Sequence, residues 1–266
     1  NMPGLFKRLK LLRLHLRNGA AISYPWRRYK EGNVAPAAGI AYCFLSEEHT
    51  SLIRRYSRKM KVGETAFLLS CLDDVCCDAF LTQQSDRVWM LPHDFRQNLR
   101  GNCTAPMNFR LSGKPSVSDI YNQMKALYRS GILWGGWTYS NFSRYLSRGI
   151  IEKAYNRMKK PGWFGVYANM GHWRSTDSNT NDLTFVSAPP ASIVCPITAG
   201  SLVWEGRVGF SMQLHSTLSE DVADTESLLL RWIQKINENV GATGDEIIID
   251  SVCSLSLVDR AQRLTS

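Results

Sequence analysis

The chain has 266 residues, of which 44% are apolar and 21% charged, so it can bury a sizeable core and has the composition of an ordinary globular protein. Its net charge is +9, but residues 1–30 hold eight Lys or Arg and no Asp or Glu, while the remainder is almost neutral. A nucleic-acid-binding domain would usually spread its basic residues over a folded face, so no nucleic-acid partner is expected. No apolar run could span a bilayer and no early stretch looks like a secretory signal, which favours a cytoplasmic location.

The seven cysteines form no Cys-x-x-Cys pair, and Cys71, Cys76 and Cys77 fall on an apolar helical pattern. Cysteine in such a pattern behaves as a small hydrophobic residue. We therefore expect reduced, buried thiols rather than a metal or redox site. The sequence also contains no Gly-x-Ser-x-Gly elbow, no Gly-rich phosphate loop and no cluster of residues at metal-ligand spacing.

In chain order, the first predicted element is a helix over residues 4–18. Its apolar and basic side chains lie mostly on different faces. The apolar stripe is formed by Leu5, Leu9, Leu12 and Leu16, widened by Leu11 and Leu14, and the basic residues are Lys7, Lys10, Arg13 and Arg17. Such a helix could lie on an anionic membrane surface, dock an acidic partner, or connect and pack on the domain. Since residues 19–38 indicate an extended connector, we assign residues 1–38 to a basic amphipathic leader or linker and residues 39–266 to the folded domain.

The folded domain mixes helices with strands. A predicted helix follows Ser46 as its N-cap, and another runs from about residue 64 to 81, with Asp73, Asp74 and Asp78 mostly outside. Further helices are predicted over 117–129, 141–158 and about 222–240. Strands are predicted over 41–45, 87–91, 103–111, 163–168, 182–186, 192–197, 202–204, 207–215 and 247–249. This mixture indicates an α+β two-layer sandwich, in which helices cover a mostly antiparallel sheet.

The stretch Trp134-Gly135-Gly136-Trp137 is unusual in composition. If exposed, its tryptophans could line a groove for a ligand or a partner. Alternatively, the two Trp residues around the Gly residues are packing residues.

Two short motifs resemble a known family. Asp94-Phe95-Arg96, followed by Gly101-Asn102, resembles the Asp-Leu-Arg…Gly-Asn element in the second lobe of acyltransferases of the chloramphenicol-acetyltransferase-like superfamily. Residues 166–171, Val-Tyr-Ala-Asn-Met-Gly, resemble the Val-x-Ser-Asn-Leu-Gly element of the same superfamily, with Ala168 in place of Ser. The superfamily includes peptide-synthetase condensation domains, wax ester synthases and alcohol acetyltransferases. The resemblance covers roughly residues 35–240 and implies the fold of one lobe.

The resemblance also implies that the catalytic base is missing. Members of the superfamily use a His-x-x-x-Asp motif, whose histidine takes the proton from an acceptor hydroxyl or amine, and in two-lobed members this motif lies in the first lobe. None of the five histidines here, His15, His49, His93, His172 and His215, has Asp four residues later. The chain thus resembles a C-terminal lobe alone, cut from something longer. A basic helical linker joins the lobes at about the place of residues 4–18, which supports the connecting-helix alternative.

Arg96 is the candidate partner of the aspartate in that motif, because bidentate geometry suits Arg better than Lys. Alternatively, Asp94 and Arg96 pair with each other or cap a turn. Asn102, with Gly101, is expected to shape the turn that follows. Adjacent strand residues point to opposite faces, so His93 and Asp94 are not expected to form a relay.

Asn169 and Gly171 are expected to shape a strand end beside the substrate tunnel. His172 follows them directly and is either a solvent-facing residue or a replacement for the missing base. The serine that Ala168 replaces is a plausible contact for an oxyanion or a thioester in some members, so its absence weakens the case for intact chemistry.

Two functions follow from the resemblance. In the first, the chain is the C-terminal lobe of an enzyme that moves an acyl group from a coenzyme A or carrier-protein thioester to a hydroxyl or amine, without a tightly bound cofactor. In the second, it is a non-catalytic binding or scaffold module of the same fold. The expected partners are the missing N-terminal lobe or a second copy of the chain, an acyl-carrier protein, and a membrane surface contacted through residues 4–18. The isolated chain is expected to be inactive.

Overall fold

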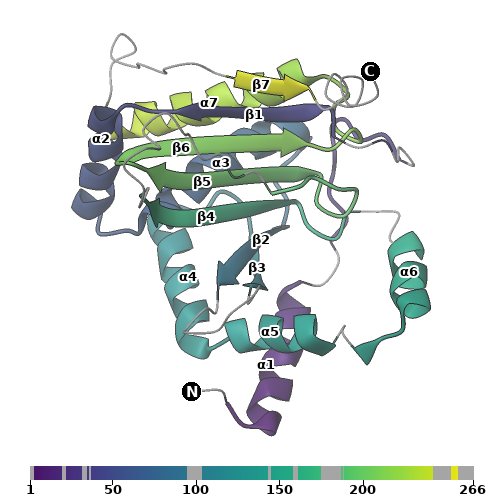
Figure 1. Cartoon of the computed structure of the whole chain (residues 1–266). Helices are drawn as coiled ribbons and strands as arrows, with labels where there is room; N and C mark the ends of the chain where they lie inside the picture. Colours follow the sequence, from purple (N-terminus) through teal and green to yellow (C-terminus); the bar gives the residue numbers. More distant parts are fainter. Residues whose placement is uncertain are drawn as a thin grey trace.

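The computed structural model describes residues 3–19, 22–31, 35, 37–94, 104–142, 145–157, 161–174, 187, 189–241 and 253–256. Its centre is a seven-stranded sheet in the order β3-β2-β4-β5-β6-β1-β7 (Figure 1). The strands are β1 (Gly39–Phe44), β2 (Arg87–Asp94), β3 (Thr104–Leu111), β4 (Gly165–Trp173), β5 (Ile197–Trp204), β6 (Arg207–Leu214) and β7 (Cys253–Ser256). The helices are α1 (Leu5–Asn18), α2 (Glu47–Lys59), α3 (Glu64–Phe80), α4 (Val117–Ser130), α5 (Leu133–Phe142), α6 (Arg148–Arg157) and α7 (Val222–Val240).

The pairing of the strands confirms the predicted α+β sandwich and adds one feature. Most neighbouring strands run antiparallel, as expected. In the middle of the sheet, however, β4 runs parallel to both β2 and β5. Parallel neighbours need crossover connections, and here helices α4 to α6 lie between β3 and β4 in the chain.

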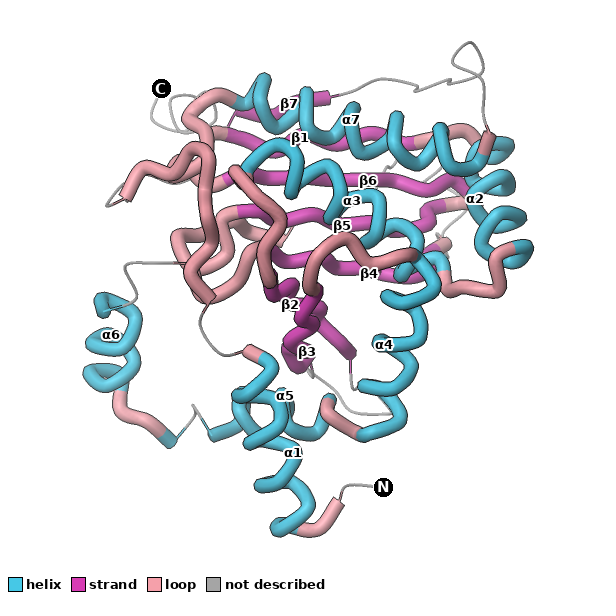
Figure 2. The backbone as a smooth tube through the Cα atoms, turned by 180° about the vertical axis from the view of Figure 1, so that it is seen from behind, coloured by secondary structure: helices cyan, strands magenta, loops and turns pink. Residues whose placement is uncertain are grey.

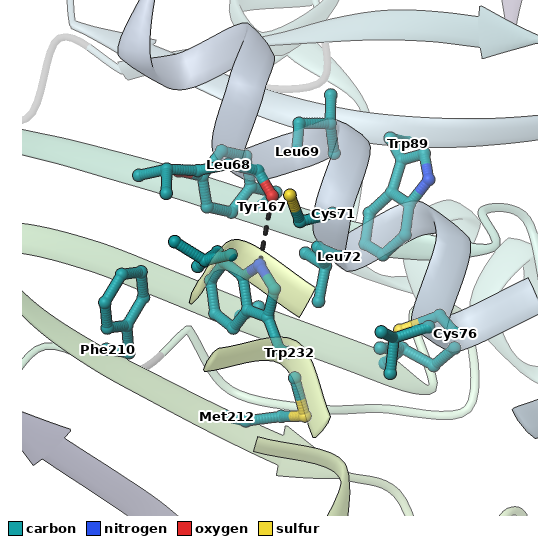
Figure 3. Close-up of a cluster of buried hydrophobic side chains, with 14 of the residues drawn as sticks. Leu68, Leu69, Cys71, Leu72, Cys76, Trp89, Tyr167, Phe210, Met212 and Trp232 are labelled. Atoms are coloured by element: carbon teal, nitrogen blue, oxygen red, sulfur yellow. Dashed lines mark hydrogen bonds between the residues drawn. The ribbon is translucent and has the colours of Figure 1, made fainter. Parts of the chain in front are cut away.

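Helices α3 and α7 cover one face of the sheet, as the view from behind shows (Figure 2). The fully buried Trp232 of α7 holds this layer together. Its indole nitrogen donates a hydrogen bond of 3.0 Å to the backbone oxygen of Leu68 in α3 (Figure 3). Its ring meets those of Phe210 at 4.8 Å and Tyr167 at 6.0 Å between centroids. Both helices therefore share one apolar core with β4 and β6.

The opposite face of β5 and β6 is covered by Ser187 and by residues 189–191. The hydroxyl of Ser211 donates to the backbone oxygen of Ser187, and the hydroxyl of Thr198 donates to that of Pro189 at 2.6 Å. A side chain on Gly200 would lie 2.7 Å from the Ser187 oxygen, so glycine permits this close approach. As a result, both faces of β5 and β6 are buried. The strand predicted over 182–186 lies outside the described residues.

Asp73 was expected mostly outside, and this expectation is wrong. Only 3% of Asp73 is exposed, and it forms an ion pair with Arg87 of β2, of which 1% is exposed. The guanidinium donates to both carboxylate oxygens, at 2.6 Å from Nε to Oδ1, and Trp89 Nε1 donates to Oδ1 at 2.8 Å. Buried charges are tolerated when they are paired and hydrogen-bonded in this way. The network joins α3 to the start of β2.

The Trp134-Gly135-Gly136-Trp137 stretch belongs to α5 and supports the packing interpretation. A Cβ atom on Gly135 would lie 2.2 Å from the backbone oxygen of Leu11 in α1, and one on Gly136 would lie 2.0 Å from that of Pro106 in β3. The two glycines therefore let α5 touch both elements. The single helix predicted over 141–158 is wrong, because α5 ends at Phe142 and α6 begins at Arg148.

The leader is part of the packed structure. The described connector contains Trp26, whose ring stacks on Phe164 at 5.3 Å and on Tyr29 at 5.6 Å. Helix α1 packs against α5 and β3. It docks through Leu11 and His15, so that Leu11, which widens the predicted apolar stripe, is buried, while Leu5, Leu9, Leu14 and Leu16 stay exposed.

The C-terminal strands differ in detail from the prediction. The strands expected over 192–197 and 202–204 are replaced by one strand, β5, and Ser192 forms only an isolated bridge with Cys195. The strand expected over 247–249 lies outside the described residues. The cysteines that the structure describes outside β7 are all buried, as expected, and are Cys43, Cys71, Cys76, Cys77 and Cys195. None of the described helices is long and apolar enough to cross a membrane.

Candidate functional site

A cavity of about 520 Å³ opens where β2 and β4 separate. These strands pair only at Trp89–Gly165 and Met90–Val166. Beyond that point β2 continues along β3, while β4 continues along β5. The space between them is closed by the end of α2, the start of α3 and the end of α4. Its polar lining comprises Arg54, Ser57, Arg58, Glu64, Thr65, His93, Tyr128, Tyr167, Asn169, His172 and Ser201.

The three tunnel residues expected from the second motif lie together at this cavity. The Asn169 side chain donates to Thr65 Oγ1 at 2.9 Å and accepts from the backbone N–H of Gly171 at 2.9 Å. Gly171 has a φ of +72°, a conformation that favours glycine. The register with β5 shifts between Asn169 and His172. Such an irregularity redirects side chains along a strand, and here it places both Asn169 and His172 on the cavity.

His172 is held by an arginine. Nη2 of Arg54 lies 3.2 Å from Nδ1 of His172, and Nε of Arg54 lies 4.0 Å from a carboxylate oxygen of Glu64. A guanidinium has only donors, so Nδ1 must accept this bond and a neutral imidazole carries its proton on Nε2. The only nitrogen lone pair of the neutral ring that could accept a proton, on Nδ1, is therefore engaged by Arg54. This geometry argues against His172 as the replacement base and makes Nε2 a donor.

His93 is a second histidine on the same cavity. It lies in β2, and its ring centroid is 5.6 Å from that of Tyr128 in α4. Burial lowers the pKa of His93, and the charge of Asp94 opposes this shift to a lesser extent. A neutral imidazole can accept a proton. In the sequence His93 stands out only as the neighbour of Asp94, and nothing in the spacing shows that β2 brings it to the same cavity as His172.

The first motif is only partly described. Asp94 is the last residue of β2, is exposed, and lies opposite Thr104 of β3. Arg96 and Asn102, with Gly101, lie outside the described residues. The structure thus brings Asn169, Gly171 and His172 together, and Asp94 does not line the cavity.

Residue 168 faces away from the cavity. Its neighbours Tyr167 and Asn169 both line the cavity, and side chains alternate along a strand. Ala168 lies opposite Gly200 in the register with β5. A serine at this position would therefore not point into the cavity.

Helix α2 and strand β5 also line the cavity, through residues that neither motif includes. Arg54 and Arg58 are four residues apart and thus share a helix face, a signal that could have identified them. Tyr167 and Ser201 are joined by a buried hydrogen bond of 2.8 Å. Burial raises the pKa of Tyr167, so its hydroxyl stays protonated. Among the described residues, no group of three His, Cys, Asp or Glu side chains could hold a metal ion.

No family model matches the chain, and neither does any curated protein. Solved structures do match. The epimerization domain from the third module of tyrocidine synthetase B has a TM-score of 0.58 and 14% identity, over 89% of this chain and 57% of that chain. The condensation domain of the Monacolin K polyketide synthase has a TM-score of 0.59 and 11% identity, over 88% of this chain and 58% of that one. The trichothecene 15-O-acetyltransferase of Fusarium sporotrichioides has a TM-score of 0.58 and 12% identity, over 89% and 52%.

These similarities define the fold. The chain has the fold of the chloramphenicol-acetyltransferase-like superfamily, the superfamily that the two motifs resemble. It spans only about half the length of the solved structures named here, and 25% of a multidomain nonribosomal peptide synthetase that it also matches.

Proposed function

We propose that the chain is the C-terminal lobe of an acyltransferase, and that the cavity is its part of the substrate site. The lobe would help move an acyl group from a coenzyme A or carrier-protein thioester to a hydroxyl or amine. One observation carries this proposal: Asn169, Gly171 and His172, selected by a motif, line a cavity of about 520 Å³ in a chain with the condensation-domain fold. The chain covers only 57% of one of its structural neighbours and 52% of another, which supports the need for a second lobe.

The proposal divides the chemistry between two lobes. The general base is the histidine of a His-x-x-x-Asp motif on the other lobe, and Arg96 pairs with the aspartate of that motif. His172 acts as a donor, since its Nδ1 accepts from Arg54. A donor at Nε2 can hold the carbonyl oxygen of an acyl group as negative charge develops on it. The cavity needs no tightly bound cofactor for this reaction.

The test is an assay of thiol release from an acyl thioester. The isolated chain should release thiol at the background rate, because general-base help typically contributes about 10²–10⁴-fold. Activity should appear when a lobe that bears His-x-x-x-Asp is supplied, and His172→Ala should then reduce it. The matched control is Leu230→Ala, at an exposed position of α7 away from the cavity.

Three results would contradict parts of this proposal. Activity of the isolated chain that is lost in His172→Ala or His93→Ala would place the base on this lobe. If Arg96→Ala changes neither the activity nor the folding of the two-lobed protein, Arg96 is not the partner of the aspartate. If the two-lobed protein shows no transfer with any thioester, the proposed reaction is wrong.

A second candidate is a non-catalytic binding module of the same fold. It is favoured by the engagement of Nδ1 of His172 by Arg54 and by the lack of any histidine followed four residues later by Asp. Calorimetry with an acyl-pantetheine thioester separates the two functions. Binding that is weakened by Asn169→Ala, without turnover in the two-lobed protein, would establish the binding module.

A further inference from the structure

Helix α1 keeps an apolar stripe that it does not use for docking. At 3.6 residues per turn, Leu5, Leu9 and Leu16 follow one another along one side of the helix. The docked side, with Leu11 and His15 buried, lies next to it. The three stripe leucines remain about half exposed or more. Phe6, of which 88% is exposed, lies on a different side of the helix, together with Arg13 and Arg17. The helix therefore presents a continuous apolar surface to the outside.

A basic stripe runs beside this apolar surface. Lys10, Arg13 and Arg17 follow one another along a third side of α1, and all three are exposed. None of them forms an ion pair with an acidic residue that the structure describes, and α1 itself contains no Asp or Glu. Between this stripe and the end of α4 lies a hollow of about 750 Å³. It is lined by Phe6, Lys7, Lys10, Leu11, Arg13, Leu14, Arg17 and Ser130.

The position of α1 leaves both stripes accessible. In both views α1 lies at the end of the molecule opposite α7, beyond the edge of the sheet (Figures 1 and 2). Its main contacts are with α5 and β3, and its buried residues, Leu11 and His15, lie in the middle of the helix and in its C-terminal half. The N-terminal turns, which carry Leu5 and Phe6, project away from the body.

We propose that α1 binds the surface of an anionic membrane. The leucines of the apolar stripe would enter the interface between the headgroups and the acyl chains. Lys10, Arg13 and Arg17 would contact lipid phosphates. A helix of 14 residues is too short to span the bilayer and lies along its surface. The charge pattern selects this occupant, because an exposed apolar stripe beside a basic stripe, on a helix without Asp or Glu, matches a surface of phosphates over hydrocarbon. The inference is independent of the proposed acyl transfer.

The experiment is co-sedimentation of the purified chain with vesicles. We expect binding to vesicles of phosphatidylcholine with about 30% phosphatidylglycerol, weaker binding to phosphatidylcholine alone, and release by salt, since charge attraction is screened. Each basic residue near an anionic surface contributes about fivefold to binding. The triple variant K10Q/R13Q/R17Q should therefore bind at least tenfold more weakly. L5S/L9S/L16S should also lose binding, because the apolar stripe is removed.

The matched control is R55Q/K59Q/K125Q, which removes the same charge from exposed positions on α2 and α4 and should bind as the unchanged chain does. All the substituted side chains are exposed, so circular dichroism and thermal unfolding should show that each variant folds. Equal loss in the control and the α1 variant would show a non-specific charge effect and overturn the proposal. Absence of binding to anionic vesicles would also overturn it. The proposal is also overturned if L5S/L9S/L16S binds vesicles normally but no longer joins a second lobe, because the apolar stripe would then serve the contact between lobes.

Discussion

His15 is a buried titratable residue in the contact between α1 and the body. Its backbone oxygen accepts from Asn108 Nδ2 at 3.2 Å, and the Asn108 oxygen accepts from Trp163 Nε1 at 2.7 Å. Burial lowers the pKa of His15 from 6.5 to about 4. The docked helix thus requires a neutral imidazole, which makes the contact sensitive to acid.

The predicted result is a loss of stability between pH 6.5 and pH 4. In this window the unfolded chain binds a proton on His15 that the folded chain does not, so protonation favours unfolding. Above pH 6.5 the contribution of His15 to the unfolding free energy is fully present. The shift predicts a loss of about 2 kcal/mol between pH 7 and pH 5, measured by guanidinium unfolding. His93 and His215 also have lowered pKa values, so the comparison must be made with His15→Gln, whose stability should fall less over the same range. An equal fall in both proteins would contradict the assignment.

Single residues also show what the sequence could not reveal. Asp73 lies on a helix among other acidic residues, and its burial depends on Arg87 and Trp89, which reach it from a strand. Similarly, the leucine stripe of α1 was visible in the sequence, but the face that docks contains a histidine and a single leucine. Which face of α1 docks is decided by Asn108 and Gly135, which belong to other elements. Periodicity identifies apolar faces, and it does not say which face meets a partner.

The contact between α1 and α5 depends on two glycines in the middle of a helix. Gly135→Ala or Gly136→Ala would place a methyl group 2.2 or 2.0 Å from a backbone oxygen, so α1 or β3 must move. We expect a loss of about 1–3 kcal/mol in stability, as overpacking typically costs, and faster cleavage of α1 by trypsin at Arg13 and Arg17. Thermal unfolding and limited proteolysis measure the two effects.

Gly149→Ala is the matched control, since Gly149 also lies in a helix and has nothing within 4 Å of the added methyl group. It should be neutral or should stabilise α6 by about 1 kcal/mol, because alanine favours helices. If Gly135→Ala and Gly149→Ala behave alike, the close approach of α1 is not required for stability.

Elements with one clear apolar face were the easiest to predict. Helices α2, α3, α4 and α7 lie within a few residues of their predicted bounds, and Ser46 caps α2 by accepting from the backbone N–H of His49. By contrast, α5 was missed because its two central glycines weaken the helical pattern. The parallel pairing of β4 with β2 and β5 could not be predicted, because the alternation of side chains carries no strand order. The motif identified Asn169 and His172. The spacing of Arg54 and Arg58 indicates a shared helix face, but only the fold places Arg54 and His93 at the same cavity.

A lobe that normally faces another lobe should associate with something when isolated. Beside the cavity, Met170 and Trp173 are exposed by 37% and 40% at the end of β4. We predict that the isolated chain self-associates through this end, in a manner that depends on concentration in sedimentation velocity. Met170→Ser with Trp173→Ser should shift the chain toward the monomer, whereas Leu230→Ser, an exposed apolar residue on α7, should not. Repeating the experiment with L5S/L9S/L16S removes any contribution of α1. A monomer at all concentrations would contradict the prediction.

The place of β1 in the sheet has a consequence for synthesis on the ribosome. β1 is an early strand, yet its antiparallel partner is β6, and Thr50, which follows β1, bonds to Val208, 158 residues later. At about 5–20 residues per second, this partner emerges roughly 8–30 s after β1. During that interval β1 lacks both of its neighbours in the sheet, β6 and β7, although α3 can already pack against β2. The nascent chain is therefore a client for chaperones until β6 is made, and a ribosome that stalls before residue 207 leaves an aggregation-prone product.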